Sequence, residues 1–278
     1  MHPLPSSQRA LYMTAFLAAL MAAGCTSPNG GTRATTHQVR YELTWKADQW
    51  NGQARAQERV LVNDLGYTVR LTRGYVVTRS MELVECPKTA FDDPLTLPSD
   101  LVPWLAPRAA YAGHTMGTPN PAAISVPRVE SLTDAATVTA GTVSLAPQRY
   151  CQVHYLVARA DQNTVNLPHD LDMVDSSLHA EGTYRARGAE QDTPFRLHTT
   201  VANGRLVDLF PPGRFGDAPA QFILDTGSDG ADVVIRRDVD RLFNGMDFAT
   251  MPEKTMVRQL LQNLIDTLQV EVRRRPDV

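Results

Sequence analysis

Apolar and polar residues alternate along the first well-patterned part of the chain. Every second residue is apolar between positions 38 and 45 (QVRYELTW), which predicts a strand with one buried face. Residues 60–62 and 67–72 repeat this period on either side of a turn at 63–66, and residues 75–84 extend it. These segments predict the first strands of a β-rich domain.

The same two-residue period returns in the second half of the chain and then gives way to a helical one. Strand-like segments are 137–145, 150–158, 177–185, 195–202, 221–224 and 231–236. Between 250 and 270, apolar residues recur at the spacing of one helix face. We therefore expect a mainly β protein, a β-sandwich of roughly eight to ten strands with a C-terminal helix at 250–270.

Prolines interrupt the pattern between 87 and 127. This stretch holds eight prolines, which lack the backbone N–H that a helix or a central strand needs. Loops of this length inside a compact domain are uncommon and are usually functional. We expect one β-rich domain at 38–278 that contains a long proline-rich loop at 87–127.

The N-terminal region has the pattern of an export signal. Residues 10–23 form a run of fourteen without a charge, which is shorter than the roughly 20 residues that span a bilayer. The run ends in MAAGC at 21–25, which resembles a bacterial lipobox. The resemblance implies a lipoprotein signal peptide at 1–24, a lipid-modified Cys25 and a polar tether at 25–37. A simple secretory signal followed by a chance cysteine is the alternative.

A lipid on Cys25 would anchor the chain to a bacterial membrane without a spanning helix. Thr26 and Ser27 follow it, and the absence of an aspartate here sends lipoproteins of enteric-type bacteria to the outer membrane. We therefore expect an outer-membrane lipoprotein of the cell envelope that faces the periplasm. The chain has Lys+Arg 27 against Asp+Glu 30, and this lack of cationic excess argues against nucleic acid as a partner.

Two cysteines remain once Cys25 is assigned to the anchor. In an oxidising compartment Cys86 and Cys151 most simply form a disulfide. Such a bond would be worth roughly 4 kcal/mol on the chain-entropy model. A metal site with two thiolate ligands is the alternative.

Three histidines occupy predicted strands in the same phase. His154, His179 and His198 alternate with apolar residues and should lie on the polar side of their strands. If these strands are neighbours, the imidazoles can converge on one sheet face, where neutral nitrogen ligands suit Cu or Zn. Three independent surface histidines are the alternative. In the proline-rich loop, His114 and Met116 form a soft pair that suits copper.

The motif Asp-Thr-Gly-Ser at 225–228 resembles the active-site turn of aspartic proteases. That chemistry needs two carboxylates that share a proton, and the chain has one such triplet. The alternative is a tight turn between two strands. We therefore assign no catalytic residue, and Asp225 stays the residue to test.

Two short segments are similar to bacterial periplasmic copper-binding lipoproteins of the MbnP-like type. They are RYCQVHY at 149–155 and LFNGMDF at 242–248. The resemblance implies an exported β-rich protein with histidine and tryptophan ligands to copper and a di-haem peroxidase as partner. The chain has two cysteines beyond Cys25, whereas part of that group has four.

The expected function is that of a non-enzymatic, periplasm-facing lipoprotein that binds or handles a transition metal, Cu or Zn. The candidate ligands are His154, His179, His198, His114 and Met116. The expected partners are the membrane, through the lipid, and a periplasmic or outer-membrane protein. One alternative is an accessory or structural lipoprotein whose long loop docks a membrane partner. The other is a hydrolase that depends on Asp225.

Overall fold

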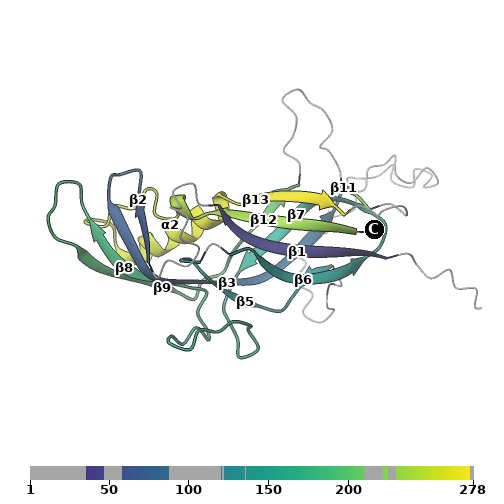
Figure 1. Ribbon diagram of the computed structural model, residues 1–278, viewed down its shortest axis with the longest axis horizontal. Helices are drawn as coiled ribbons and strands as arrows, with labels where there is room; N and C mark the ends of the chain where they lie inside the picture. Colours follow the sequence, from purple (N-terminus) through teal and green to yellow (C-terminus); the bar gives the residue numbers. More distant parts are fainter. Residues whose placement is uncertain are drawn as a thin grey trace, which may run out of the picture. The chain divides into compact units, whose positions relative to one another are not determined.

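Strands make up most of the folded chain in the computed structural model (Figure 1). The structure describes residues 36–46, 58–87, 120, 122–134, 136–209, 222–224 and 230–275. Four residues that the sequence singles out lie outside this part: Cys25, His114, Met116 and Asp225. Among the described residues, no helix combines the length and the apolar character needed to cross a membrane.

The smaller sheet joins the beginning and the end of the described chain. Its order is β13 (Gln269–Arg274), β12 (Gly230–Asp238), β1 (His37–Lys46) and β6 (Val138–Leu145). β1 and β12 run parallel, with Tyr41 opposite Val233, whereas the other neighbours are antiparallel. Parallel neighbours need a long crossover connection, and here almost the whole domain lies between the two strands.

The larger sheet is built around one long strand, β3 (Thr68–Glu85). Its main path is β10 (Asn203–Asp208), β7 (Arg149–Val157), β3, β8 (Leu178–Arg185) and β9 (Thr193–Thr199). Four shorter strands pair with β3 or β7, namely β2 (Arg59–Val62), β4 (Ala123–Ile124), β5 (Arg128–Ser131) and β11 (Phe222–Ile223). Register shifts follow Leu71 and Thr78, and such bulges bend β3 so that its two halves pair with different neighbours.

Apolar side chains from the inward faces of both sheets form the main core. In β1, Val39, Tyr41 and Leu43 have no exposed surface, as their alternation predicts. The helix α2 (Glu253–Asp266) adds its apolar stripe to the same core, with Leu260 and Leu264 completely buried. The predictions of a mainly β, sandwich-like fold and of a C-terminal helix are confirmed.

The described residues form thirteen strands, which is more than the roughly eight to ten expected from the pattern of apolar and polar residues. β4 and β11 have two residues each, too few for a period of two to be recognised. β4 belongs to the expected loop at 87–127, whose end joins the sheet where Ile124 pairs with Met81 of β3. The helix ends at Asp266, before the expected 270, because the chain turns there into β13.

A disulfide between Cys86 and Cys151 connects the end of β3 to β7, as predicted. The two residues are 65 positions apart in sequence, and their Cα atoms lie 4.8 Å from each other. Both sulfur atoms are used in this bond, so the alternative of a two-thiolate metal site does not apply.

A buried ion pair connects the two sheets. Arg237 of β12 has no exposed surface and donates two hydrogen bonds to the carboxylate of Glu130 in β5, at 2.8 and 2.6 Å. Thr78 Oγ1 also donates to Glu130, and Arg237 donates to the hydroxyl of Tyr155. The guanidinium carbon lies 4.1 Å from the ring centroid of Trp45. A shift of one sheet against the other would leave a buried charge unpaired, which is costly.

The segment 158–177 covers part of the outer face of the larger sheet. It contributes to a second small core, which consists of Val77, Val129, Ala160 and Met173, with Tyr75, Leu167 and Leu171 packed against them. Among the polar residues of β3 and β8, His179 is 4% exposed, whereas the side chain of Arg73 is 36% exposed.

Candidate functional site

Two of the three strand histidines come together. His179 of β8 and His198 of β9 are direct cross-strand partners, with ring centroids 6.4 Å apart. His179 pairs with Tyr75 of β3, whereas His154 of β7 pairs with Glu82, seven residues further along β3. At the usual rise of a strand, that separation is about 20 Å. The structure thus brings His179 and His198 together and leaves His154 apart.

The three histidines differ in burial although they share the side of the sheet opposite to the main core. His179 is 4% exposed because segment 158–177 covers this part of the sheet. His198 is exposed and His154 is half-buried. Alternation therefore predicts the face of each ring, but the covering segment decides which ring is shielded from water.

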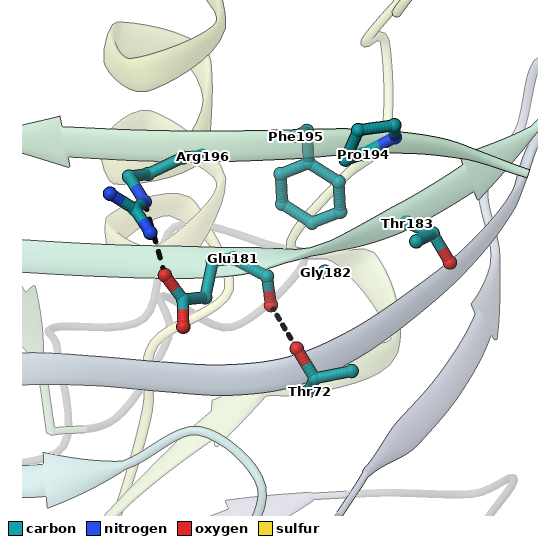
Figure 2. Close-up of a pocket in the computed structure, with 7 residues that line it drawn as sticks. All are labelled: Thr72, Glu181, Gly182, Thr183, Pro194, Phe195 and Arg196. Carbon is teal, nitrogen blue, oxygen red and sulfur yellow. Dashed lines mark hydrogen bonds and ion pairs between the residues drawn. The ribbon is translucent and has the colours of Figure 1, made fainter. Parts of the chain in front are cut away.

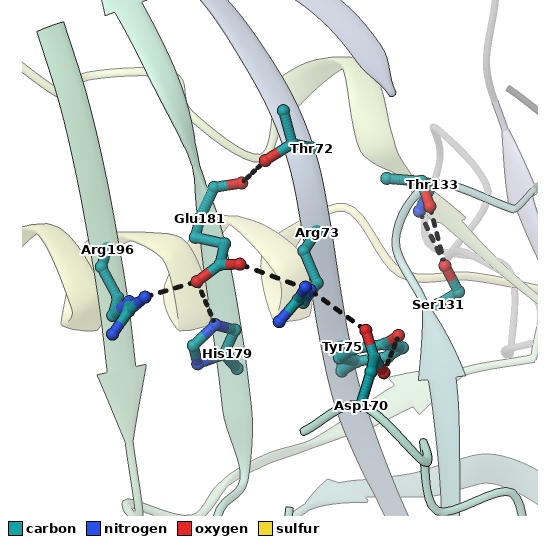
Figure 3. A network of polar contacts seen from close by, with 9 residues as sticks. All are labelled: Thr72, Arg73, Tyr75, Ser131, Thr133, Asp170, His179, Glu181 and Arg196. Carbon is teal, nitrogen blue, oxygen red and sulfur yellow. Dashed lines mark hydrogen bonds and ion pairs between the residues drawn. The ribbon is translucent and has the colours of Figure 1, made fainter. Parts of the chain in front are cut away.

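Charged side chains surround His179, with Glu181 at their centre (Figure 3). Glu181 Oε2 lies 3.1 Å from both His179 Nε2 and Arg196 Nε. Its Oε1 lies 3.3 Å from Arg73 Nε, which is also 3.3 Å from Asp170 Oδ2. We call this group the Glu181 cluster, and its members are Arg73, Tyr75, Asp170, His179, Glu181, Arg196 and His198.

The charges of the Glu181 cluster balance internally. The guanidinium groups of Arg73 and Arg196 face the carboxylates of Asp170 and Glu181. Burial raises the pKa of Glu181, but the hydrogen bond with His179 and the nearby positive charges outweigh it, and the net shift is downward. Glu181 is therefore ionised at neutral pH and accepts hydrogen bonds only.

Both imidazoles of the pair are held at Nε2. His179 Nε2 bonds to Glu181, and His198 Nε2 lies 2.8 Å from the hydroxyl of Ser176. Burial lowers the pKa of His179 and outweighs the hydrogen bond to Glu181, so the ring is neutral at pH 7. A neutral ring that donates from Nε2 carries its lone pair on Nδ1. Within the described part of the chain, neither Nδ1 has a hydrogen-bond partner.

An open depression of about 460 Å³ borders the cluster (Figure 2). Glu181 and Arg196 belong to its wall, together with Thr72, Gly182, Thr183, Pro194 and Phe195. A Cβ on Gly182 would lie 1.9 Å from the carbonyl oxygen of Arg70, so β3 and β8 can approach this closely only with glycine. The ring of Phe195, the cross-strand partner of Gly182, lies beside the position that has no side chain.

Among the residues that the structure describes, no group of three or more His, Cys, Asp or Glu is arranged to hold a metal ion. His154 has a separate role, since its Nδ1 lies 3.3 Å from Glu82 Oε1 and Glu82 also accepts a hydrogen bond from Asn120. For a borderline ion, the available ligands are therefore His179 and His198, with Glu181 as the nearest carboxylate.

Sequence reasoning found the histidines but not the charged residues around them. Glu181 and Arg196 share the strands and the phase of the two histidines, so the same alternation could have identified them. No local signal shows that Arg73 and Asp170 lie beside these histidines. A bulge in β3 between Leu71 and Arg73 decides on which side of the sheet Arg73 lies. Asp170 belongs to segment 158–177, and the packing of this segment places its carboxylate beside Arg73.

No known protein family, curated protein sequence or solved structure gives a significant match to this chain.

Proposed function

We propose that this chain is a non-enzymatic, periplasm-facing lipoprotein, anchored to the outer membrane through Cys25, that binds Cu or Zn. His179 and His198 would supply the protein ligands. The observation that carries the proposal is the cross-strand pairing of these two imidazoles, with ring centroids 6.4 Å apart and Glu181 beside them.

The spacing of the pair suits a shared ion. Metal–imidazole bonds are about 2.0–2.1 Å long, and directly opposite residues of antiparallel strands have Cβ atoms about 4.5–5.5 Å apart. Imidazoles carried at two such opposite positions can reach one ion that lies between them. β8 pairs with β3 on one side and β9 on the other, which holds the backbone of His179 in place.

The hydrogen bonds at Nε2 support the same function. Metal-binding histidines usually donate their second ring N–H to a carboxylate or another acceptor, which fixes the tautomer and raises the basicity of the ligand. Glu181 has this position for His179, and Ser176 has it for His198. The lowered pKa of His179 also makes the proton a weaker competitor for the ring.

Two protein nitrogens leave positions open around a four-coordinate ion. Water or donor atoms of another molecule would fill these positions. A metal held in this way exchanges readily, as expected of a protein that handles a metal and passes it on.

Metal titration of the purified full chain near neutral pH tests the proposal. We expect one equivalent of Cu(II) or Zn(II) to bind to the unmodified chain, and this binding to be lost in His179→Gln and in His198→Gln. Glu181→Gln should weaken it by about tenfold, because Glu181 orients the ligand ring.

His154→Gln is the matched control. His154 lies on the same sheet face about 20 Å away, so its replacement should leave metal binding unchanged. The proposal is overturned if no stoichiometric metal binds. It is also overturned if binding survives in both His179→Gln and His198→Gln, or if the control loses as much binding as they do.

A further inference from the structure

A second cavity, of about 300 Å³, lies where the edges of the two sheets meet. It shares only Tyr75 with the Glu181 cluster. The smaller sheet contributes Trp45 and Val138, and the larger sheet contributes residues of β3 and β5. The described residues that line it include Trp45, Tyr75, Glu130, Ser131, Asp134 and Asn166. Its volume is at the lower end of the range for small-molecule sites, which suits a ligand of one ring.

One wall of this cavity is rigid. The carboxylate of Glu130 is fixed by two hydrogen bonds from Arg237, at 2.8 and 2.6 Å, and by Thr78. Trp45 is 7% exposed and has the guanidinium of Arg237 at 4.1 Å from its ring centroid. A ligand would therefore meet a carboxylate and the small exposed part of the Trp45 ring, both of which already have their orientation.

The charges around the cavity disfavour both cations and anions. Arg237 already neutralises Glu130, so this carboxylate offers no uncompensated negative charge to a cationic ligand. Of the lining residues that the structure describes, none is cationic, and Glu130 and Asp134 are acidic, which disfavours an anion. Arg59 attracts Asp134 electrostatically and offsets part of its charge. An uncharged ligand is the class that remains.

Polar groups at the rim of the cavity can form hydrogen bonds with hydroxyl groups of a ligand. Asp134 Oδ1 accepts the backbone N–H of Ala136, and among the described residues its Oδ2 has no hydrogen-bond partner. Ser131 and Asn166 stand in the same lining, and Ser131 is the cross-strand partner of Tyr75 (Figure 3). Aromatic rings bury C–H surfaces, while a carboxylate oxygen accepts strong hydrogen bonds from hydroxyl groups.

We propose that this cavity binds one uncharged pyranose ring, with its C–H face against Trp45 and Tyr75 and its hydroxyl groups bonded to Asp134. The site is independent of the metal proposed at His179 and His198. Either proposal can therefore fail without the other.

Titration of the full chain with neutral pyranosides tests this inference. The probes are methyl β-D-glucopyranoside, methyl β-D-galactopyranoside and N-acetyl-D-glucosamine, with choline as a cationic and D-glucuronate as an anionic comparison. Saturation-transfer NMR and calorimetry should detect binding of at least one neutral probe with a Kd of about 1 mM. Asp134→Asn should weaken it by about tenfold, because a charge-assisted hydrogen bond is lost.

Asp172→Asn is the matched control. Asp172 is exposed and accepts the backbone N–H of the residue two positions on, as Asp134 does, but it does not line the cavity. Binding of the neutral probe should be unchanged in this variant. The inference is overturned if no neutral pyranoside binds, if choline or glucuronate binds more tightly, or if the two variants weaken binding equally.

Discussion

Replacing Glu130 by glutamine tests how the two sheets are held together. The variant keeps the shape of the side chain but removes the negative charge that faces Arg237, whose side chain has no exposed surface. Removing one partner of a buried ion pair costs about 3–5 kcal/mol, because the other charge stays buried and uncompensated. For a chain of this size, we expect the Tm to fall by about 6–20 °C.

Urea denaturation followed by circular dichroism measures this loss as a lower midpoint at unchanged slope. Asp266→Asn is the control, because Asp266 pairs with Arg205 at 3.2 Å with both side chains about half exposed. This variant should cost less than about 1 kcal/mol. A combined Glu130→Leu and Arg237→Met variant leaves no buried charge unpaired. Its loss in unfolding free energy should therefore be smaller than the sum of the losses in Glu130→Leu and Arg237→Met alone. If Glu130→Gln costs no more than Asp266→Asn, the ion pair does not join the sheets as argued.

Three further changes test other parts of the fold by urea denaturation. Replacing Cys86 and Cys151 together by serine should cost about 2–5 kcal/mol, because the bond closes a long loop, and an unchanged midpoint would contradict this. Gly182→Ala should cost about 3 kcal/mol or more, since its Cβ would lie 1.9 Å from a β3 carbonyl oxygen. Gly188→Ala is the control, because Gly188 has φ 80° but no atom near the position of a Cβ, and it should cost about 1 kcal/mol. If the two glycine variants lose the same stability, the clash at Gly182 does not exist. The folded pKa of His179 is lowered below its ordinary 6.5, so its contribution to stability is complete above that pH and is lost as the pH falls. In His179→Gln, the urea midpoint should therefore fall less steeply as the pH is lowered below 6.5, and an unchanged profile would refute this contribution.

The candidate site shows which structural features the alternation of apolar and polar residues can predict and which it cannot. The phase of segments 177–185 and 195–202 is sufficient to assign His179 and His198 to one face, and the same phase includes Glu181. It cannot show that β8 and β9 are neighbours with these two histidines opposite each other, because register depends on pairing between strands. The same limit explains why His154, in an equivalent phase on β7, lies about 20 Å away.

The amino-acid sequence by itself determined the local elements and the disulfide between Cys86 and Cys151. The two-residue period of β1, the apolar stripe of α2 and the pairing of the last two cysteines all follow from local pattern or from composition. Only the tertiary structure decided the parallel pairing of β1 with β12, the ion pair between Arg237 and Glu130, and the cover of segment 158–177 over His179. These features join residues far apart in the chain. They depend on which apolar faces pack against each other and on where bulges shift the strand register. Neither the packing partners nor the bulge positions produce a periodic pattern in the sequence.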